Sequence, residues 1–301
     1  MMGWVLDAAA LRMLLRLTLW LWSAMLKSNP LQARPTLLRK VAQAMPRLLS
    51  YRPIVQRLRR VAAPQRARVA LFTGCVGDIV ERAVLHDALR LLRAAGVNAA
   101  IPTSQGCCGA LYQHGGLPER ASACATRNAD AFAGCDTVLP LATGCGAALR
   151  DLSRQAHGSA AALAPKVRDL CTALAEALDA QPPRFGNLPK RIGIHIACTQ
   201  VNVFAGSGSI RQLLARIPGV ELIDLAPESG CCGAAGTAFI SQPAQADALR
   251  APKLAAAAGV DIIVSANIGC SLHLLAGLRQ QSDRKIPVLH PVSLLAQALE
   301  D

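Results

Sequence analysis

The chain has 301 residues, enough for one large domain or two of ordinary size. Hydrophobic residues make up 52% of it and charged residues 17%, a balance that excludes a disordered protein. Aromatic residues amount to 3%, too few for the stacking platforms of proteins that bind single-stranded nucleic acid. The formal net charge is +13, but residues 1–68 hold thirteen of the 32 Lys and Arg and a single acid, Asp7. The rest of the chain is nearly neutral, so we expect no nucleic-acid partner.

The basic N-terminal segment contains an apolar stretch, residues 4–26, that is interrupted by Arg12 and Arg16. The apolar run after Arg16 is too short to cross about 30 Å of hydrocarbon, and the charges are misplaced for an export signal. We predict a helix that packs against protein. The alternatives are peripheral membrane contact through residues 1–28 and, third, a true span. Prolines interrupt the stretch that follows, so we interpret residues 1–65 as a basic amphipathic helical arm.

Eleven cysteines, an odd number, occur in a chain too long to need disulfide staples. Because no export signal precedes them, we expect a cytoplasmic protein, at the inner face of the membrane if the arm binds lipid. In that compartment clustered cysteines indicate metal or redox ligands rather than disulfide bridges.

Three sequence anchors occur twice, in the same order. The pairs are "RVALFTGC" (68–75) with "RIGIHIAC" (191–198), "QGCCGA" (105–110) with "SGCCGA" (229–234), and "DTVLPLATGC" (136–145) with "DIIVSANIGC" (261–270). The cysteine intervals are 32 and 37 positions in the first copy and 33 and 38 in the second. This agreement predicts a duplication, with one repeat in residues 66–183 and the other in 184–301.

Strands and helices are predicted to alternate within each repeat. In the first repeat the order is strand 68–75, helix 81–96, strand 97–102, helix 118–134 and strand 136–145. In the second it is strand 191–198, helix 209–219, strand 220–226, helix 243–259, strand 261–270, strand 286–291 and a short C-terminal helix. This order predicts an α/β fold of two βαβ-type repeats, each with a small parallel sheet and a core of its own. The seam is expected at 179–189, which is rich in Pro and Gly.

The anchoring cysteines are predicted to converge at one edge of each sheet, because ligands bind beyond the carboxyl ends of parallel strands. Two adjacent thiols can face one centre only where the backbone bends, and the glycines on either side of each pair allow this. The sequence therefore predicts two four-thiol sites: Cys75, Cys107, Cys108 and Cys145, and Cys198, Cys231, Cys232 and Cys270.

Four converging thiols can hold an iron–sulfur cluster, a structural zinc ion or a redox disulfide pair. Structural zinc normally uses C-x₂₋₄-C knuckles, and the chain contains no C-x-x-C. We therefore favour one or two iron–sulfur clusters of the [4Fe–4S] type, for which four ligands suffice, with zinc as the alternative occupant of one site. No general base, nucleophile or substrate pocket is evident, so no catalytic residue is predicted.

The pattern C-x₃₁-CC-x₃₆-C followed by C-x₃₂-CC-x₃₇-C resembles the cysteine-rich CCG domain. That domain occurs twice in the cluster-bearing subunit of heterodisulfide reductase, in the iron–sulfur subunit of glycolate oxidase and in lactate-utilisation iron–sulfur proteins. The motifs "GCCGALYQHGG", "ATGCGA", "CCGAAGT", "NIGC" and "PVLHPVSLL" are most similar to the glycolate oxidase type. Over residues 66–301 the resemblance implies an electron-transfer subunit of a flavin-linked oxidoreductase. Electrons would come from a flavoprotein subunit and leave to a ferredoxin-domain protein or a quinone.

Two features depart from the family pattern. Each family repeat ends in C-x-x-C, which supplies the fifth thiol of the non-cubane clusters in heterodisulfide reductase; here those positions are Ala148 and His273. This argues against the alternative function of a disulfide reductase, and a zinc-stabilised or metal-free scaffold is the third hypothesis. His273 is an additional candidate ligand. The ferredoxin-like domain of the glycolate oxidase type has no counterpart before Arg68, so its clusters are expected on another polypeptide.

Four further residues are assigned weaker roles. Cys124 and Cys135 have no counterpart in the second repeat and are predicted to be core or surface residues, and Cys171 fits an apolar core pattern. His195 lies three residues before Cys198. We interpret it either as a satisfied strand histidine or as a hydrogen-bond donor to a cluster sulfur.

Overall fold

The computed structural model describes residues 67–300 except 157, 207 and 282–285. The predicted arm, including residues 1–28, lies outside the described residues. Among the helices of the described part, none is long and apolar enough to cross a membrane.

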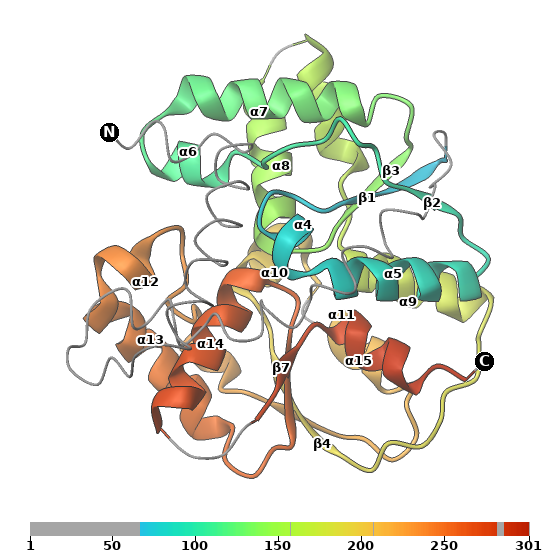
Figure 1. Cartoon of the computed structure of the whole chain (residues 1–301), viewed down its shortest axis with the longest axis vertical. Coiled ribbons are helices and arrows are strands. Elements are labelled where there is room, and N and C mark those ends of the chain that lie inside the picture. The colour runs from blue at the N-terminus through green and yellow to red at the C-terminus, as the bar shows by residue number, and fades with distance from the viewer. Residues whose placement is uncertain (1–66, 157, 207, 282–285, 301) are drawn as a thin grey trace, which may run out of the picture.

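Each repeat contains one parallel sheet, as predicted (Figure 1). The first sheet has the order β2-β1-β3, with strands β1 (Val69–Phe72), β2 (Ala99–Ala100) and β3 (Thr137–Pro140). The second has the order β5-β4-β6-β7, with strands β4 (Arg191–His195), β5 (Glu221–Asp224), β6 (Ile262–Ser265) and β7 (Val288–Leu289). In both sheets the first strand lies between the next two, and all the pairs are parallel. The α/β fold of two parallel-sheet repeats is therefore confirmed.

Helices connect and cover these strands. Those of the first repeat are α4 (Gly77–Val80), α5 (Arg82–Ala94), α6 (Ala110–His114), α7 (Pro118–Ala131), α8 (Thr143–Gln155), the 3-10 helix η2 (Gly158–Lys166) and α9 (Leu170–Ala180). Those of the second are α10 (Cys198–Phe204), α11 (Ser209–Leu214), the 3-10 helix η3 (Pro227–Ser229), α12 (Ala238–Ser241), α13 (Pro243–Ala256), α14 (Ile268–Gln281) and α15 (Pro291–Ala298). Proline begins α7, α13 and α15, where its missing N–H has no intrahelical partner to lose.

The strands are shorter than predicted. We expected strands to run up to the anchoring cysteines, but β3 ends at Pro140 and β6 at Ser265. Cys145 and Cys270 instead lie in the first turns of α8 and α14. The strands have two to five residues, and the glycine before each of these two cysteines belongs to the helix.

The alternation of side chains along β1 divides the core. Leu71 packs in a cluster that also contains Ile192 and Ile194 of β4, whereas the buried neighbours of Ala70 and Phe72 on the opposite face all belong to the first repeat. A smaller buried cluster belongs to the second repeat alone. The prediction of a separate core for each repeat is thus wrong for one face of each sheet, because the two sheets bury those faces in one shared cluster.

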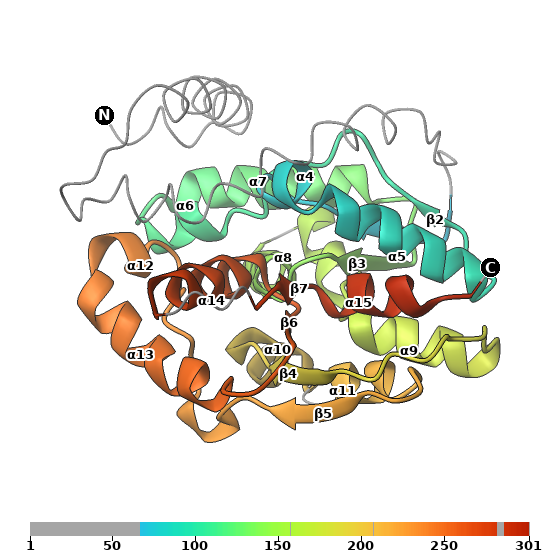
Figure 2. The same cartoon turned by 60° about the horizontal axis from the view of Figure 1, so that its bottom comes forward.

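The repeats also exchange contacts at their carboxyl-terminal helices. Helix α15 packs against α5 of the first repeat, and α9 packs against α11 of the second (Figure 1). Buried His290, at the start of α15, makes a 3.0 Å hydrogen bond from Nε2 to the carbonyl of Leu141. The backbone N–H of Thr143 donates to the carbonyl of Ala266 at 3.0 Å. The first bond ties the start of α15 to the segment after β3, and the second joins the segments after β3 and β6, which lead to Cys145 and Cys270. Figure 2 shows α8 and α14, the helices that begin with these segments, in the middle of the molecule.

Candidate metal centres

Four of the predicted ligands lie where a strand leads into a helix. Cys75 follows β1 and precedes α4, and Cys198 is the first residue of α10. Cys145 and Cys270 lie in the first turns of α8 and α14, helices of 13 and 14 residues. The amino-terminal end of a helix carries partial positive charge, which favours the thiolate form of a cysteine.

The adjacent cysteines are held by a sharp turn at the glycine that follows them. Gly109 and Gly233 have φ angles of +88° and +87°, a left-handed conformation that glycine adopts without a steric penalty. This conformation aims each glycine N–H back at the first thiol of its pair. Gly109 donates to Cys107 Sγ at 3.4 Å and Gly233 to Cys231 Sγ at 3.3 Å. The preceding glycines differ, since Gly230 has a positive φ and Gly106 has none.

A buried polar residue on α7 and another on α13 hold backbone at or before each CCG loop. In the first repeat, Asn128 of α7 accepts a bond from Gly106 N at 3.0 Å and donates to the Cys107 carbonyl at 2.8 Å. In the second repeat the matched position on α13 is Lys253, whose Nζ donates to the carbonyl of Ala226. Both side chains are almost completely buried. Asn128 therefore bonds to the CCG loop itself, whereas Lys253 bonds to the backbone five residues before Cys231.

In the first repeat the thiols gather around Cys107. Cys75 Sγ lies 3.7 Å from Cys107 Sγ. Cys108, Cys124 and Cys75 all donate hydrogen bonds to the Cys107 sulfur, and these bonds lower the pKa of Cys107. Cys108 also hydrogen-bonds with Cys145, so the four predicted ligands form one connected group.

Cys124 joins this group, which the sequence did not predict. Half-buried on α7, it donates to Cys107, and this hydrogen bond raises the pKa of the Cys124 thiol. The duplicated cysteine spacing could not predict this position, because the matched residue of the second repeat is the exposed Leu249. Helical periodicity was the one sequence pattern that could have indicated the position of Cys124. Cys124 lies four residues before Asn128, on the face of α7 that braces the CCG loop.

In the second repeat the four predicted ligands hydrogen-bond one after another, and no single cysteine bonds to all the others. Cys198 donates to Cys231, and Cys231 in turn to Cys232. Cys232 hydrogen-bonds with Cys270. Cys270 also accepts a bond from Asn267 Nδ2 at 3.5 Å. Cys232 and Cys270 are 2% and 4% exposed, so the inner end of this chain is closed to solvent.

His195, the last residue of β4, lies beside this inner pair. One nitrogen of His195, together with the sulfurs of Cys232 and Cys270, forms a set whose members all lie within 4.8 Å of one another. The ring is completely buried, and its Nδ1 lies 3.0 Å from Ser265 Oγ. Burial, with Lys253 as a second cause, lowers the pKa of His195 to about 4, so the imidazole is neutral at pH 7.

His273, the additional candidate ligand, is buried between α13 and α14. Its Nε2 lies 3.1 Å from the carbonyl oxygen of Ala246, and its Nδ1 lies 3.4 Å from Arg250 Nη1. The same arginine donates to the His273 carbonyl at 2.8 Å. Both ring nitrogens therefore have protein partners, and this buried side chain braces α14 against α13.

Residues beside the two cysteine groups contact each other across the interface between the repeats. A Cβ placed on Gly144 would lie 3.2 Å from Asn267 Oδ1. The first turn of α8, which contains Cys145, therefore lies against the residue that hydrogen-bonds to Cys270. Nearby, Thr199 Oγ1 donates to Thr143 Oγ1 at 2.9 Å. The residues next to one candidate centre thus contact those next to the other.

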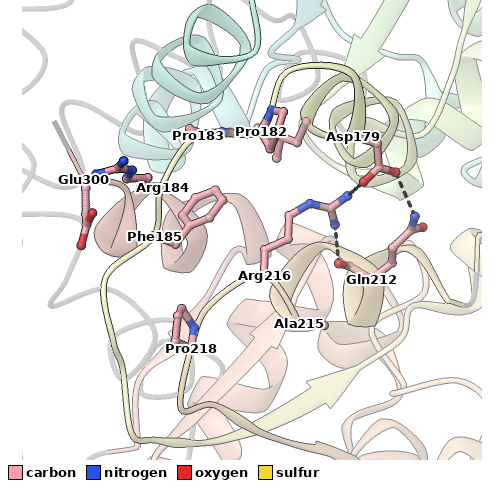
Figure 3. Close-up of a pocket in the computed structure, with 11 residues that line it drawn as sticks. Asp179, Pro182, Pro183, Arg184, Phe185, Gln212, Ala215, Arg216, Pro218 and Glu300 are labelled. Atoms are coloured by element: carbon pink, nitrogen blue, oxygen red, sulfur yellow. Dashed lines mark hydrogen bonds and ion pairs between the residues drawn. The ribbon is translucent and has the colours of Figure 1, made fainter.

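A cavity of about 700 Å³ lies elsewhere, at the predicted seam, and no cysteine lines it (Figure 3). Its wall includes Phe185 and the polar side chains Asp179, Gln212 and Arg216. Arg216 hydrogen-bonds to Asp179, which also accepts a bond from Gln212. Since these polar groups already bond to one another, the cavity does not indicate a ligand site.

The donor sets at the two cysteine groups fit a thiophilic metal centre. Cysteine thiolates select zinc, copper(I) and iron–sulfur clusters over magnesium or calcium. Backbone N–H groups and helix amino termini offset the negative charge that several thiolates would bring together.

Similar proteins match this chain over most of its length. The "Probable glycolate oxidase iron-sulfur subunit" of Bacillus subtilis is 30% identical over 291 residues, covering 92% of this chain and 66% of that protein. The "Glycolate oxidase iron-sulfur subunit" of Escherichia coli is 30% identical, covering 78% and 59%. "Lactate utilization protein A" of Shouchella clausii is 27% identical, covering 75% and 98%. The chain thus spans less than two thirds of the length of the two glycolate oxidase subunits.

A family model described as a cysteine-rich domain, CCG, matches residues 69–150 and 192–275. Each match contains one complete cysteine group, and the second match ends before strand β7 of its sheet. The chain belongs to the cysteine-rich CCG domain family and carries two copies of the domain.

Proposed function

We propose that this protein is an iron–sulfur electron-transfer subunit of a flavin-linked oxidoreductase of the glycolate or lactate oxidase type. The observation that carries the proposal is the duplicated convergence of four thiols at the carboxyl ends of two parallel sheets. One centre would be held by Cys75, Cys107, Cys108 and Cys145, and the other by Cys198, Cys231, Cys232 and Cys270. An iron–sulfur cluster bound there would supply one-electron chemistry, and the cubane [4Fe–4S] form is the one we propose for each.

The partners follow from this role. Electrons would come from a flavoprotein subunit and leave to a ferredoxin-domain protein or to a quinone. The names of the Bacillus subtilis and Escherichia coli relatives, which are iron–sulfur subunits of glycolate oxidase, support such a complex. Two centres whose flanking residues contact each other suit a chain that passes electrons from one partner to another.

We further propose a division into an arm (1–65), a first repeat (66–183) and a second repeat (184–301). We propose that the arm packs against protein, and the alternative is contact of residues 1–28 with the cytoplasmic face of the membrane. Under that alternative, deletion of residues 1–28 should release the protein from the membrane fraction of lysed cells. An unchanged membrane fraction would remove the alternative of lipid contact.

Metal analysis of anaerobically purified full-length protein tests the central claim. We expect iron and acid-labile sulfide, and an electron paramagnetic resonance (EPR) signal after reduction with dithionite. Replacing Cys108 by Ser should remove one centre, and Cys232→Ser the other, each with its share of the iron. Colourless protein with stoichiometric zinc and no iron would overturn the electron-transfer function.

One distance favours zinc as the second candidate. A tetrahedral zinc ion with Zn–S bonds of about 2.3 Å holds two thiolate sulfurs about 3.8 Å apart. Cys75 Sγ and Cys107 Sγ lie 3.7 Å apart. Zinc in the first repeat alone would make that repeat a structural support for a single redox centre in the second, and the same metal analysis would show zinc and iron together.

A further inference from the structure

The second repeat buries a polar pair that the first repeat lacks. His195 and Ser265 end the neighbouring strands β4 and β6, and both are completely buried. At the matched positions, three residues before Cys75 and five before Cys145, the first repeat has Phe72 and Pro140. Phe72 packs there against Phe132, with ring centroids 6.0 Å apart. An apolar filling is therefore compatible with this part of the fold, and the polar pair needs another explanation.

The His195 ring is fixed from one side and unsatisfied on the other. Its Nδ1 hydrogen-bonds with Ser265 Oγ at 3.0 Å. Its Nε2 is buried and has no hydrogen-bond partner among the described residues. Leaving a buried polar atom unpaired costs about 1–3 kcal/mol, so such atoms usually have a partner in the functional protein.

The candidate partner of Nε2 is a metal centre that His195 would share with the two buried thiols. The ligand atoms of His195, Cys232 and Cys270 lie within 4.8 Å of one another, a spacing that a shared metal centre can bridge. When Nδ1 carries the proton and donates it to Ser265 Oγ, Nε2 presents a lone pair. This is the usual arrangement of a metal-bound histidine, whose other nitrogen is held by an oxygen atom.

We infer that His195 is a ligand of the second centre, through Nε2, in place of one of its four cysteines, and that Ser265 is the positioning residue that orients it. The inference rests on the proposed metal centre but not on its being iron–sulfur. It also makes the two centres chemically different, because only the second has a nitrogen donor. Imidazole ligation in place of thiolate raises the reduction potential of iron–sulfur centres, so we expect the second centre to be reduced first.

Nitrogen hyperfine coupling tests the inference directly. The full-length protein is produced anaerobically with ¹⁵N-labelled histidine, reduced with dithionite and examined by pulsed EPR. We expect a coupling typical of a directly bound nitrogen in the wild type. His195→Cys should abolish it while keeping the metal content, because a thiol replaces the imidazole. His195→Phe, which copies the first repeat, should lose both the coupling and roughly half of the iron if each repeat binds one cluster.

Three controls separate the outcomes. His86→Gln changes an exposed histidine of α5 and should leave the coupling intact. Ser265→Ala should alter the coupling by releasing the ring without removing it. If His195→Phe fails to fold, the wild type and His195→Cys still decide the question. A wild type without the strong coupling, or a coupling that persists in His195→Cys, overturns the inference and leaves the proposed function standing.

A zinc-only protein would instead overturn the proposed function. The ligand assignment is then tested on the same samples by zinc X-ray absorption. A Zn–N shell at about 2.0–2.1 Å in the wild type but not in His195→Cys would support it. The same shell in both proteins would refute it.

Discussion

The two repeats build their cysteine loops in the same way and surround them with different chemistry. Counting from the prolines that begin α7 and α13, Cys124 matches Leu249, Ala125 matches Arg250 and Asn128 matches Lys253. The first centre is therefore flanked by an extra thiol and a neutral amide, and the second by two buried cations. The backbone geometry that gathers the thiols is shared, but the side chains that would tune a bound centre are not.

The charge difference has a consequence for electron transfer. Reduction adds negative charge to a cluster, and a buried cation nearby stabilises that charge more than one in water would. Lys253 interacts electrostatically with Cys231, Cys232 and Cys270, while burial lowers its own pKa. We therefore expect the second centre to have the higher reduction potential and electrons to flow from the first centre to the second.

The largest expected effect tests what the repeats share. Both Gly109→Ala and Gly233→Ala put a side chain at a positive φ, at a cost of about 1–2 kcal/mol. In Gly233→Ala the new Cβ would also lie 2.3 Å from the carbonyl oxygen of Ala246, which is fixed helix backbone. In Gly109→Ala it would lie 2.8 Å from Leu152 Cδ1, a side chain that can turn away, and 3.2 Å from the Ala121 carbonyl oxygen.

We expect Gly233→Ala to destabilise the protein by about 3–5 kcal/mol and to remove the second centre. Gly109→Ala should cost about 2–3 kcal/mol and weaken only the first. Anaerobic urea unfolding and metal content measure both effects. Equal losses in the two variants would show that the repeats respond alike and that the helix carbonyl is no harder to displace than the leucine.

The second prediction concerns an acid that only the first repeat buries. Glu81, six residues after Cys75, matches Phe204, six after Cys198. It is 6% exposed, and its Oε2 has no partner among the described residues. Burial raises the pKa of Glu81 to about 8, whereas an unfolded glutamate titrates near about 4.3. Glu81 therefore does not oppose folding below the unfolded pKa, where it is protonated in both states. As the pH rises towards 8, the unfolded glutamate ionises while the buried one stays protonated, and the folded protein loses stability.

Glu81→Gln removes this loss, because the amide never ionises. The variant should be more stable than the wild type by on the order of 2–4 kcal/mol at pH 8, and the advantage should vanish near pH 4. Urea unfolding at several pH values measures it, with Glu176→Gln, an exposed glutamate paired with Arg168, as the control. A difference that does not change with pH would mean that Glu81 is ionised in the folded protein.

The sequence predicted the features that follow from repetition and missed those that occur once. The duplicated cysteine spacing gave the parallel sheets and the two thiol groups that the fold brings together, because each anchor marks the end of a strand. Cys124 and His195 could not be assigned in this way, since Leu249 and Phe72 stand at their matched positions. Their placement depends on which face of α7 or β4 meets the CCG loop, and the packing of the repeats decides that. The shared core was missed for the same reason, because a period-two pattern does not reveal what covers each face.

The third prediction reverses the charge difference. Lys253→Asn gives the second repeat the residue of the first, Asn128. A buried unit charge close to a centre is worth on the order of 1–3 kcal/mol at an effective dielectric constant of about 20. The reduction potential of the second centre should therefore fall by roughly 50–130 mV, since about 59 mV corresponds to a tenfold change for one electron.

Potentiometric titration followed by EPR measures this change. Lys190→Gln removes an exposed cation from the same repeat and serves as the control, because solvent and salt screen its charge. If both variants shift the potential equally, the effect comes from net charge, and the buried position of Lys253 has no special influence.

The smallest expected effect concerns the extra thiol of the first repeat. Cys124→Ser replaces one of the three thiols that hydrogen-bond to the Cys107 sulfur by a hydroxyl, and the half-buried site should tolerate the change at a cost below about 1 kcal/mol. If Cys124 contacts the bound centre, the EPR signal of the first centre should change while that of the second does not. Cys135→Ser, in a buried cluster of the first repeat, is the matched control and should leave both signals unaltered. Identical spectra for Cys124→Ser and wild type would leave the two centres differing in charge and in His195, but not in their number of thiols.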